Sequence, residues 1–222
     1  SIDRRGRLAA FTLGGELFIS EISSGSPTVI ENSEGAFDPR LSNDGQLVSF
    51  VINDSVYLAP TDGSAAAQLI VAGDEEMVSW GSAEFVAAEE MRRNRGHWWD
   101  STGMKLAVTR VDVSNVTTWH ISAPNEPATI PKEIKYPAAG SPNADVQLHV
   151  IDTDDYSRTE VMWNRSTHPY LVDVSWEANQ PLTLVVQTRD QQSLQVLEAD
   201  EDTGRTEKAI EINDPYWVEI VP

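Results

Sequence analysis

Residues 37–64 read FDPRLSNDGQLVSFVINDSVYLAPTDGS, and three short apolar segments in this stretch are separated by polar turns. Asn, Asp, Gly or Pro bound each segment, and the apolar side chains either alternate with polar ones or form a short block. The pattern predicts a strand, an Asn-Asp-Gly turn, a second strand, a short turn and a third strand. A meander of this kind indicates the all-β fold class.

The same strand–turn–strand pattern recurs along the chain, with turns at Gly6, Gly45, Gly103 and Gln180. These turns are 39, 58 and 77 residues apart, and the first spacing suits a four-stranded propeller blade of about 40 residues. The later spacings imply insertions, which a β-propeller accommodates in the loops at its rims. We therefore expect residues 1–222 to form an incomplete β-propeller, and the alternative is a β-sandwich with recurrent hairpins.

Two insertions break the strand pattern. Residues 82–96, SAEFVAAEEMRRNRG, predict a short helix in which Ser82 caps the N-terminus, Glu84 lies in the first turn and Gly96 provides the stop. Residues 113–145 contain five prolines, which a regular central strand does not tolerate. We expect this second segment to leave its blade as an extended arm and to return.

The composition disfavours several classes of partner. Sixteen Lys and Arg against 35 Asp and Glu give a formal charge of −19, so the surface repels phosphate backbones and weakly steers cationic partners. The chain has no cysteine, no apolar run near the roughly 18 residues of a membrane span and no visible secretory signal. We therefore expect a cytoplasmic protein that binds neither nucleic acid nor membranes. Both ends lie in predicted strands, and we expect both to be cut from a longer protein.

Sequence motifs for common catalytic chemistry are absent. There is no Gly-x-Ser-x-Gly nucleophile elbow and no glycine-rich loop that would hold a phosphate. The acidic run at residues 152–155 lacks the glycine of a calcium-binding loop. The histidines lack metal-ligand spacing, so we expect no metal or cofactor. Surface or blade-edge positions are expected for all four, namely His97, His120, His149 and His168.

Two adjacent acidic residues, Glu89 and Glu90, are the candidate site. On a helix, neighbouring side chains diverge by about 100°, so one carboxylate could face a cavity while the other flanks it. The spacing equally allows surface ion pairs with Arg93, and spacing alone favours this second interpretation. Two carboxylates held side by side in a cavity would instead bind a primary ammonium through charge-assisted hydrogen bonds, and the cation would relieve their mutual repulsion.

Two tryptophans, Trp98 and Trp99, follow the predicted helix closely. Neighbouring side chains of a strand point to opposite faces, so one should face the interface between blades and the other the opposite side. Core packing is therefore the expected role of at least one of them.

Residues 83–112, AEFVAAEEMRRNRGHWWDSTGMKLAVTRVD, resemble the propeller of the dipeptidyl peptidase IV group within the prolyl oligopeptidase family of serine peptidases. That group carries a Glu-Glu pair on a short helix, followed closely by Trp-Trp and a strand with a polar turn. Residues 187–191, QTRDQ, and residues 217–219, WVE, are similar to the bacterial members in particular. The likeness covers most of the chain from about Phe37 onward.

The resemblance implies an eight-bladed propeller that caps an α/β-hydrolase domain. This chain would supply about four blades but not the hydrolase domain, so neither the catalytic triad nor peptidase activity is expected in it alone. In the family the Glu pair binds the free N-terminus of a peptide, and dipeptides are released, usually after proline or alanine. Carried over residue by residue, Glu89 and Glu90 are the amine-binding pair.

Other parts of the resemblance are less complete. Arg93 aligns with an arginine that some members carry, and no role is assigned to it. The arginine that contacts substrate carbonyls in the family is not located in this chain. Residues 113–145 resemble the arm through which family members form homodimers. The alternatives are a tripeptidyl or acylaminoacyl peptidase of the same family and a non-enzymatic propeller scaffold that binds proteins.

Overall fold

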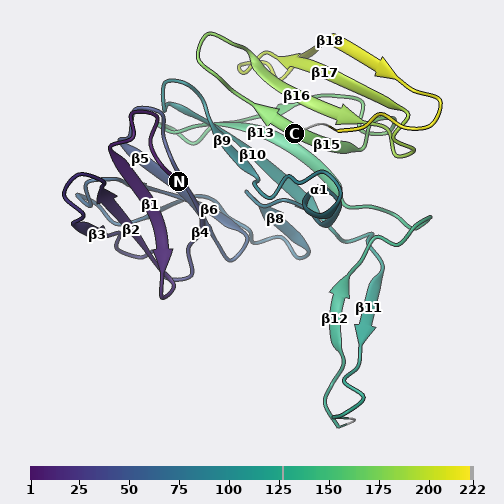
Figure 1. Cartoon of the computed structure of the whole chain (residues 1–222), viewed down its shortest axis with the longest axis horizontal. Coiled ribbons are helices and arrows are strands. Elements are labelled where there is room, and N and C mark those ends of the chain that lie inside the picture. The colour runs from purple at the N-terminus through teal and green to yellow at the C-terminus, as the bar shows by residue number, and fades with distance from the viewer. Residues whose placement is uncertain (127, 221–222) are drawn as a thin grey trace.

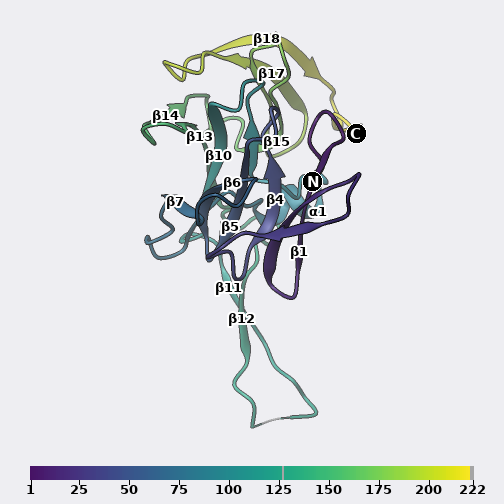
Figure 2. The same ribbon diagram turned by 90° about the vertical axis from the view of Figure 1, so that its left-hand side faces the viewer.

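The computed structural model describes residues 1–126 and 128–220, and these residues form a set of antiparallel sheets with one short helix (Figure 1, Figure 2). Four sheets follow one another along the chain, and a two-stranded hairpin projects away from them. The predicted all-β class is therefore confirmed. No helix in the described part of the chain is long and apolar enough to cross a membrane.

The first two sheets are simple meanders. Their strand orders are β1-β2-β3 and β4-β5-β6-β7, and every neighbouring pair is antiparallel. The strands are β1 (Leu8–Leu13), β2 (Glu16–Glu21), β3 (Pro27–Val29), β4 (Phe37–Leu41), β5 (Leu47–Ile52), β6 (Ser55–Pro60) and β7 (Gln68–Val71).

The third sheet has an interrupted edge. Its strand order is β14-β13-β10-β8, and β9 pairs with β10 beside β8. Because β8 and β9 pair with successive stretches of β10, they form one edge that is broken by the segment carrying helix α1 (Phe85–Glu89). The strands are β8 (Val78–Trp80), β9 (His97–Trp99), β10 (Lys105–Asp112), β13 (Asp145–Asp152) and β14 (Arg158–Val161).

The fourth sheet is again a meander, with strand order β15-β16-β17-β18. The pairing of β15 with β16 shifts register between Leu171 and Asp173, which is a β-bulge. The strands are β15 (Tyr170–Ser175), β16 (Leu182–Gln187), β17 (Ser193–Ala199) and β18 (Thr206–Asn213).

The predicted turns are present at the expected places. Gly6, Gly45 and Gly103 have φ values of 65°, 78° and 80°, in the left-handed region that glycine enters without strain. The fourth turn places Asn179, rather than its neighbour Gln180, in that region, with φ 61°. Asparagine tolerates this conformation better than most residues, so the strand–turn–strand pattern is kept here without a glycine.

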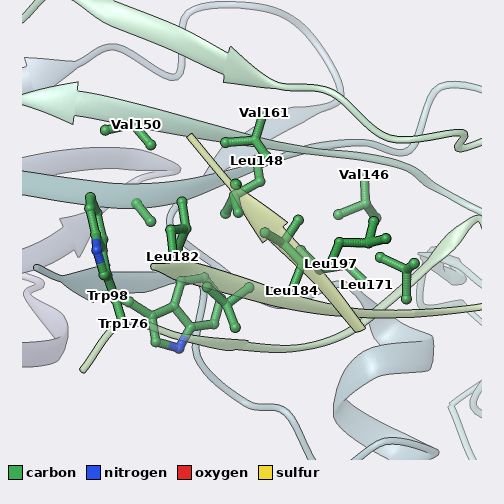
Figure 3. Packing of buried hydrophobic residues seen from close by; sticks show 14 residues of the cluster. Trp98, Val146, Leu148, Val150, Val161, Leu171, Trp176, Leu182, Leu184 and Leu197 are labelled. Carbon is green, nitrogen blue, oxygen red and sulfur yellow. The ribbon is translucent and has the colours of Figure 1, made fainter. Parts of the chain in front are cut away.

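The sheets pack face to face in chain order. One buried cluster joins the first and second sheets, another joins the second and third, and the largest joins the third and fourth (Figure 3). Trp98 packs in the largest cluster and Trp99 in the one toward the second sheet, so the predicted alternation of the two tryptophans is confirmed. The middle sheets thus bury both faces, whereas each sheet of a two-layer sandwich buries one. This serial packing is consistent with part of a β-propeller.

The hairpin that projects from the sheets is formed by β11 (Thr118–Ile121) and β12 (Lys132–Lys135) (Figure 1). It lies within the predicted arm of residues 113–145. All four residues of β11 are exposed, Trp119 and Ile121 among them. The arm is held near its base by edge-to-face contact of Tyr136 with Trp119 and with Phe85 of α1.

Candidate functional site

Helix α1 begins differently from the sequence prediction. The N-cap is Glu84, not Ser82, and its carboxylate oxygens accept hydrogen bonds from the main-chain N–H groups of Val86 at 2.5 Å and Ala87 at 2.7 Å. Ser82 is held instead in an antiparallel bridge to Arg95, near the other end of the insertion. The prediction was wrong because a capping carboxylate and a capping hydroxyl satisfy the same N–H groups, and only the chain path selects between them.

The predicted stop at Gly96 was also wrong, because the helix ends at Glu89. Its last turn is closed by the N–H groups of Met91 and Arg93, which both donate to the carbonyl of Ala87, at 3.2 and 2.9 Å. Arg92 between them has φ 58° and reverses the chain. Gly96 has another role: a side chain there would overlap the main chain of the facing Gly81–Ser82 segment.

Burial on one side of α1 decides which side chains face outward. Val86 and Met91 are buried against Val172 of β15, and this small apolar cluster fastens the helix to the fourth sheet. Glu89 and Glu90 are both exposed. The two carboxylates therefore lie on the exposed side at the end of the helix, whose buried side packs against the fourth sheet.

The ion pairs that the spacing allowed do not form. Within residues 1–126 and 128–220, neither Glu89 nor Glu90 has a cationic nitrogen within 4.0 Å. Arg93 is only 4% exposed, and it donates to the carbonyl oxygens of Leu171 at 3.1 Å and Arg95 at 2.8 Å instead. The surface ion-pair interpretation of this helix is therefore wrong, because its cation is turned inward.

A cavity of about 550 Å³ lies beside the last turn of α1. Its walls come from residues 90–93 just after the helix, from β15, β16 and β17, and from the segment that follows β18. Glu90 lines this cavity, together with the acidic Asp173 and Glu219 and the basic Arg92 and Arg93. Glu89 is not among the described lining residues. Of the predicted pair, Glu90 alone contributes to the described wall of this cavity.

The far wall is held by a contact between two motifs distant in the sequence. Gln187 is fully buried, and its side-chain amide donates to the carbonyl of Val218 at 3.0 Å. The N–H of Val218 donates in turn to the carbonyl of Gln191 at 2.7 Å. These two hydrogen bonds hold the segment around Val218 at the cavity. In this segment the indole N–H of Trp217 donates to Glu219 at 3.1 Å.

Buried charges support the helix from beneath. Burial raises the pKa of the Glu84 carboxyl, although the two N–H donors at the helix start and the nearby Arg93 oppose this effect. Burial likewise lowers the pKa of Arg93 to about 10, against the opposing attraction of Glu84 and Asp173. Arg93 therefore remains a cation at neutral pH, and its positive charge lies between the carboxyl groups of Glu84 and Asp173.

Two histidines, His97 and His168, are buried and thus depart from the expected surface position. His97 is fully buried, and its Nδ1 lies 3.2 Å from the carbonyl oxygen of Gly81. Burial lowers its pKa, so the ring is neutral at physiological pH and its role is structural. Among residues 1–126 and 128–220, no group of three or more His, Cys, Asp or Glu side chains is arranged to hold a metal ion.

The serially packed sheets, with a short helix inserted into one sheet edge, are consistent with part of a β-propeller. The chain belongs to the family described as the dipeptidyl peptidase IV (DPP IV) N-terminal region, whose model matches residues 10–221. The resemblance seen in the sequence is thereby confirmed, on a match that covers nearly the whole chain.

Similar proteins carry names of the same group. The chain is 28% identical over 220 residues to "Probable dipeptidyl-aminopeptidase B" of Pyrenophora tritici-repentis, which covers 89% of this chain and 25% of that protein. It is 26% identical over 183 residues to "Inactive dipeptidyl peptidase 10" of Rattus norvegicus, covering 78% of this chain and 23% of that protein. The chain thus spans about a quarter of the length of these relatives.

The fold also matches a solved structure. The crystal structure of Porphyromonas gingivalis dipeptidyl peptidase 4 superimposes with a TM-score of 0.81 at 17% identity, over 98% of this chain and 33% of that one. At this level of identity the match establishes the fold. The partial-propeller arrangement of the sheets therefore agrees with that of a protein whose sequence has diverged widely.

Proposed function

We propose that this chain is the N-terminus-recognition part of the propeller of a serine exopeptidase, which releases dipeptides from peptides, after proline or alanine. In this proposal about four of eight blades lie in the chain, and a catalytic α/β-hydrolase domain of the same enzyme supplies the nucleophile. The role of Glu89 and Glu90 is to bind the α-ammonium group of the substrate. The family match and the names of the relatives support the peptidase class.

The observation that carries the proposal is the exposed pair of carboxylates at the end of α1, neither of which forms an ion pair with another described residue. The last carbonyl groups of a helix carry partial negative charge, so adjacent glutamates there repel both each other and the helix end. The cavity beside them holds two further carboxylates, Asp173 and Glu219. A primary ammonium entering this cavity would relieve the repulsion and donate several charge-assisted hydrogen bonds to the carboxylates.

The kinetic test uses Glu89→Gln and Glu90→Gln in the full-length protein, with Glu207→Gln as the control. Glu207 is an exposed residue of β18 and makes no part of the cavity. Loss of one charge-assisted interaction costs about 1.5–3 kcal/mol, so kcat/KM for dipeptidyl substrates should fall roughly 10- to 150-fold, with a higher KM. Wild-type kinetics in both cavity variants would rule out the assignment.

A different cutting pattern within the same family is separable by product analysis. Peptides of graded length with free N-termini should release dipeptides if the distance from the bound ammonium to the nucleophile fits two residues. Tripeptides, or release of blocked residues, would identify a tripeptidyl or acylaminoacyl peptidase instead. Blocking the α-amine by acetylation should abolish dipeptide release, because it removes the charge that the glutamates bind.

A second candidate is a non-enzymatic propeller that only binds other proteins. The specific observation in its favour is the relative named inactive dipeptidyl peptidase 10, which matches 78% of this chain. The two candidates differ in the full-length protein: absence of hydrolysis across a panel of dipeptidyl substrates, together with retained folding, would favour the scaffold.

A further inference from the structure

Arg93 is buried although it lies only three residues after the exposed Glu90. Its Nε donates to the carbonyl oxygen of Leu171 in β15 at 3.1 Å, and its Nη1 donates to the carbonyl oxygen of Arg95 at 2.8 Å. The guanidinium carbon also lies 5.9 Å from the centre of the Trp98 ring. One side chain therefore contacts the fourth sheet, the strand entry after α1 and the core tryptophan.

Arg93 reaches the main chain of the fourth sheet at an irregular position. The pairing of β15 with β16 skips a residue between Leu171 and Asp173, and a bulge interrupts the regular ladder of hydrogen bonds. The carbonyl of Leu171 lies at that irregularity, where Arg93 supplies an N–H. A buried carbonyl without a partner is costly, so this contact fixes where Arg93 sits relative to the fourth sheet.

The charge of Arg93 is balanced within the same layer. The carboxylates of Glu84, at the start of α1, and of Asp173, beyond the bulge, both favour its cationic form against burial. Arg93 thus joins the beginning of the helix, its end and the facing strand. It also contributes its own main-chain N–H to the carbonyl of Ala87, which closes the last helical turn.

We propose that Arg93 is a positioning residue, which fixes the last turn of α1 against β15 and thereby holds the Glu90 carboxylate at the cavity. The helix has five residues and is too short to be stable by itself, so its position depends on such tertiary contacts. The effect on Glu90 rests on the proposed function of that residue, whereas the effect on the helix turn does not.

The first experiment measures the helix turn directly. In the full-length protein, Arg93→Met removes the charge and all side-chain N–H donors. Arg93→Lys keeps the charge but loses the planar guanidinium, which can donate to two carbonyl groups at once. Arg158→Met is the matched control. Arg158 also stacks on a tryptophan, 5.5 Å from the centre of the Trp80 ring, but it is exposed on β14. Hydrogen exchange of the amides of Met91 and Arg93 should accelerate in both Arg93 variants and stay at the wild-type rate in the control.

The second experiment asks whether Arg93 acts through Glu90. Arg93→Met should raise KM for a dipeptidyl substrate about 10-fold, with a smaller change in kcat. In a Glu90→Gln background the same substitution should change kcat/KM little, because the carboxylate that it positions is already gone. Independent, multiplicative effects of the two substitutions would overturn the proposal.

The outcomes remain distinguishable from those of the proposed function. If Glu90→Gln leaves kcat/KM unchanged, ammonium binding by Glu90 is refuted, and hydrogen exchange still decides whether Arg93 holds the helix turn. Wild-type exchange rates in both Arg93 variants would refute the positioning role. Should Arg93→Met fail to fold, Arg93→Lys carries both readouts, since it preserves the buried charge between Glu84 and Asp173.

Discussion

The turn between β17 and β18 provides a sharp test of how the third and fourth sheets are joined. Gly204 in this turn has φ 70°, and its carbonyl accepts a hydrogen bond from the N–H of Met162 at 2.7 Å. A Cβ atom at Gly204 would overlap the carbonyl oxygen of Glu160 in β14 and lie 2.9 Å from its carbonyl carbon. The turn can therefore dock on β14 only if residue 204 has no side chain.

We expect Gly204→Ala to destabilise the protein more than a turn glycine ordinarily does. The left-handed backbone alone costs an alanine about 1–2 kcal/mol. Separating the turn from β14 also weakens the hydrogen bond to Met162, at about 1 kcal/mol, and the forced shift adds about 1–3 kcal/mol. The total loss in the free energy of unfolding is therefore about 3 kcal/mol or more.

The matched control is Gly140→Ala. Gly140 has φ 80°, and a Cβ atom there would have no neighbour within 4 Å, so only the backbone cost of about 1–2 kcal/mol applies. Urea unfolding of both variants, with equal m-values, measures the difference, which we expect to be about 2–4 kcal/mol from the hydrogen bond and the forced shift. Equal destabilisation by the two substitutions would refute the reasoning that the close approach of Gly204 to Glu160 joins the sheets.

Two further predictions concern pH and assembly. Burial lowers the pKa of His149 to about 4, whereas a histidine in the unfolded chain titrates near 6.5. As the pH drops, the unfolded state therefore binds the proton first. The free energy of unfolding should fall between about pH 6.5 and pH 4. His149→Gln should reduce this slope in urea titrations, and an unchanged slope would contradict the assignment. The exposed hairpin of β11 and β12 is proposed to form a homodimer contact, so Trp119→Asp should shift sedimentation toward the monomer; a wild-type sedimentation profile would exclude the hairpin.

The recurring hairpins could be predicted because their signals are local. Alternating apolar residues and turn residues such as Gly45 and Gly103 specify strands and reversals through the backbone conformations that they allow. The opposite orientation of Trp98 and Trp99 followed in the same way from the two-residue period of a strand.

The path of the inserted segment could not be predicted in the same way. Ser82 and Glu84 are both acceptable N-cap residues, and Gly96 is of a residue type that commonly ends a helix. The choice depended on the facing Gly81–Ser82 main chain and on β15, which is more than 70 residues away in the sequence. Local propensity contains no information about either neighbour.

Local sequence signals were sufficient to predict the strands, their turns, the adjacent pair Glu89 and Glu90 and the family to which the chain belongs. Only the tertiary structure decided that Arg93 points inward and that Glu90, rather than Glu89, lines the cavity. The physical reason is that strands and turns follow from each residue's own backbone preferences. The direction of a charged side chain depends instead on distant main-chain groups, such as the carbonyl at the β15 bulge that accepts a hydrogen bond from Arg93.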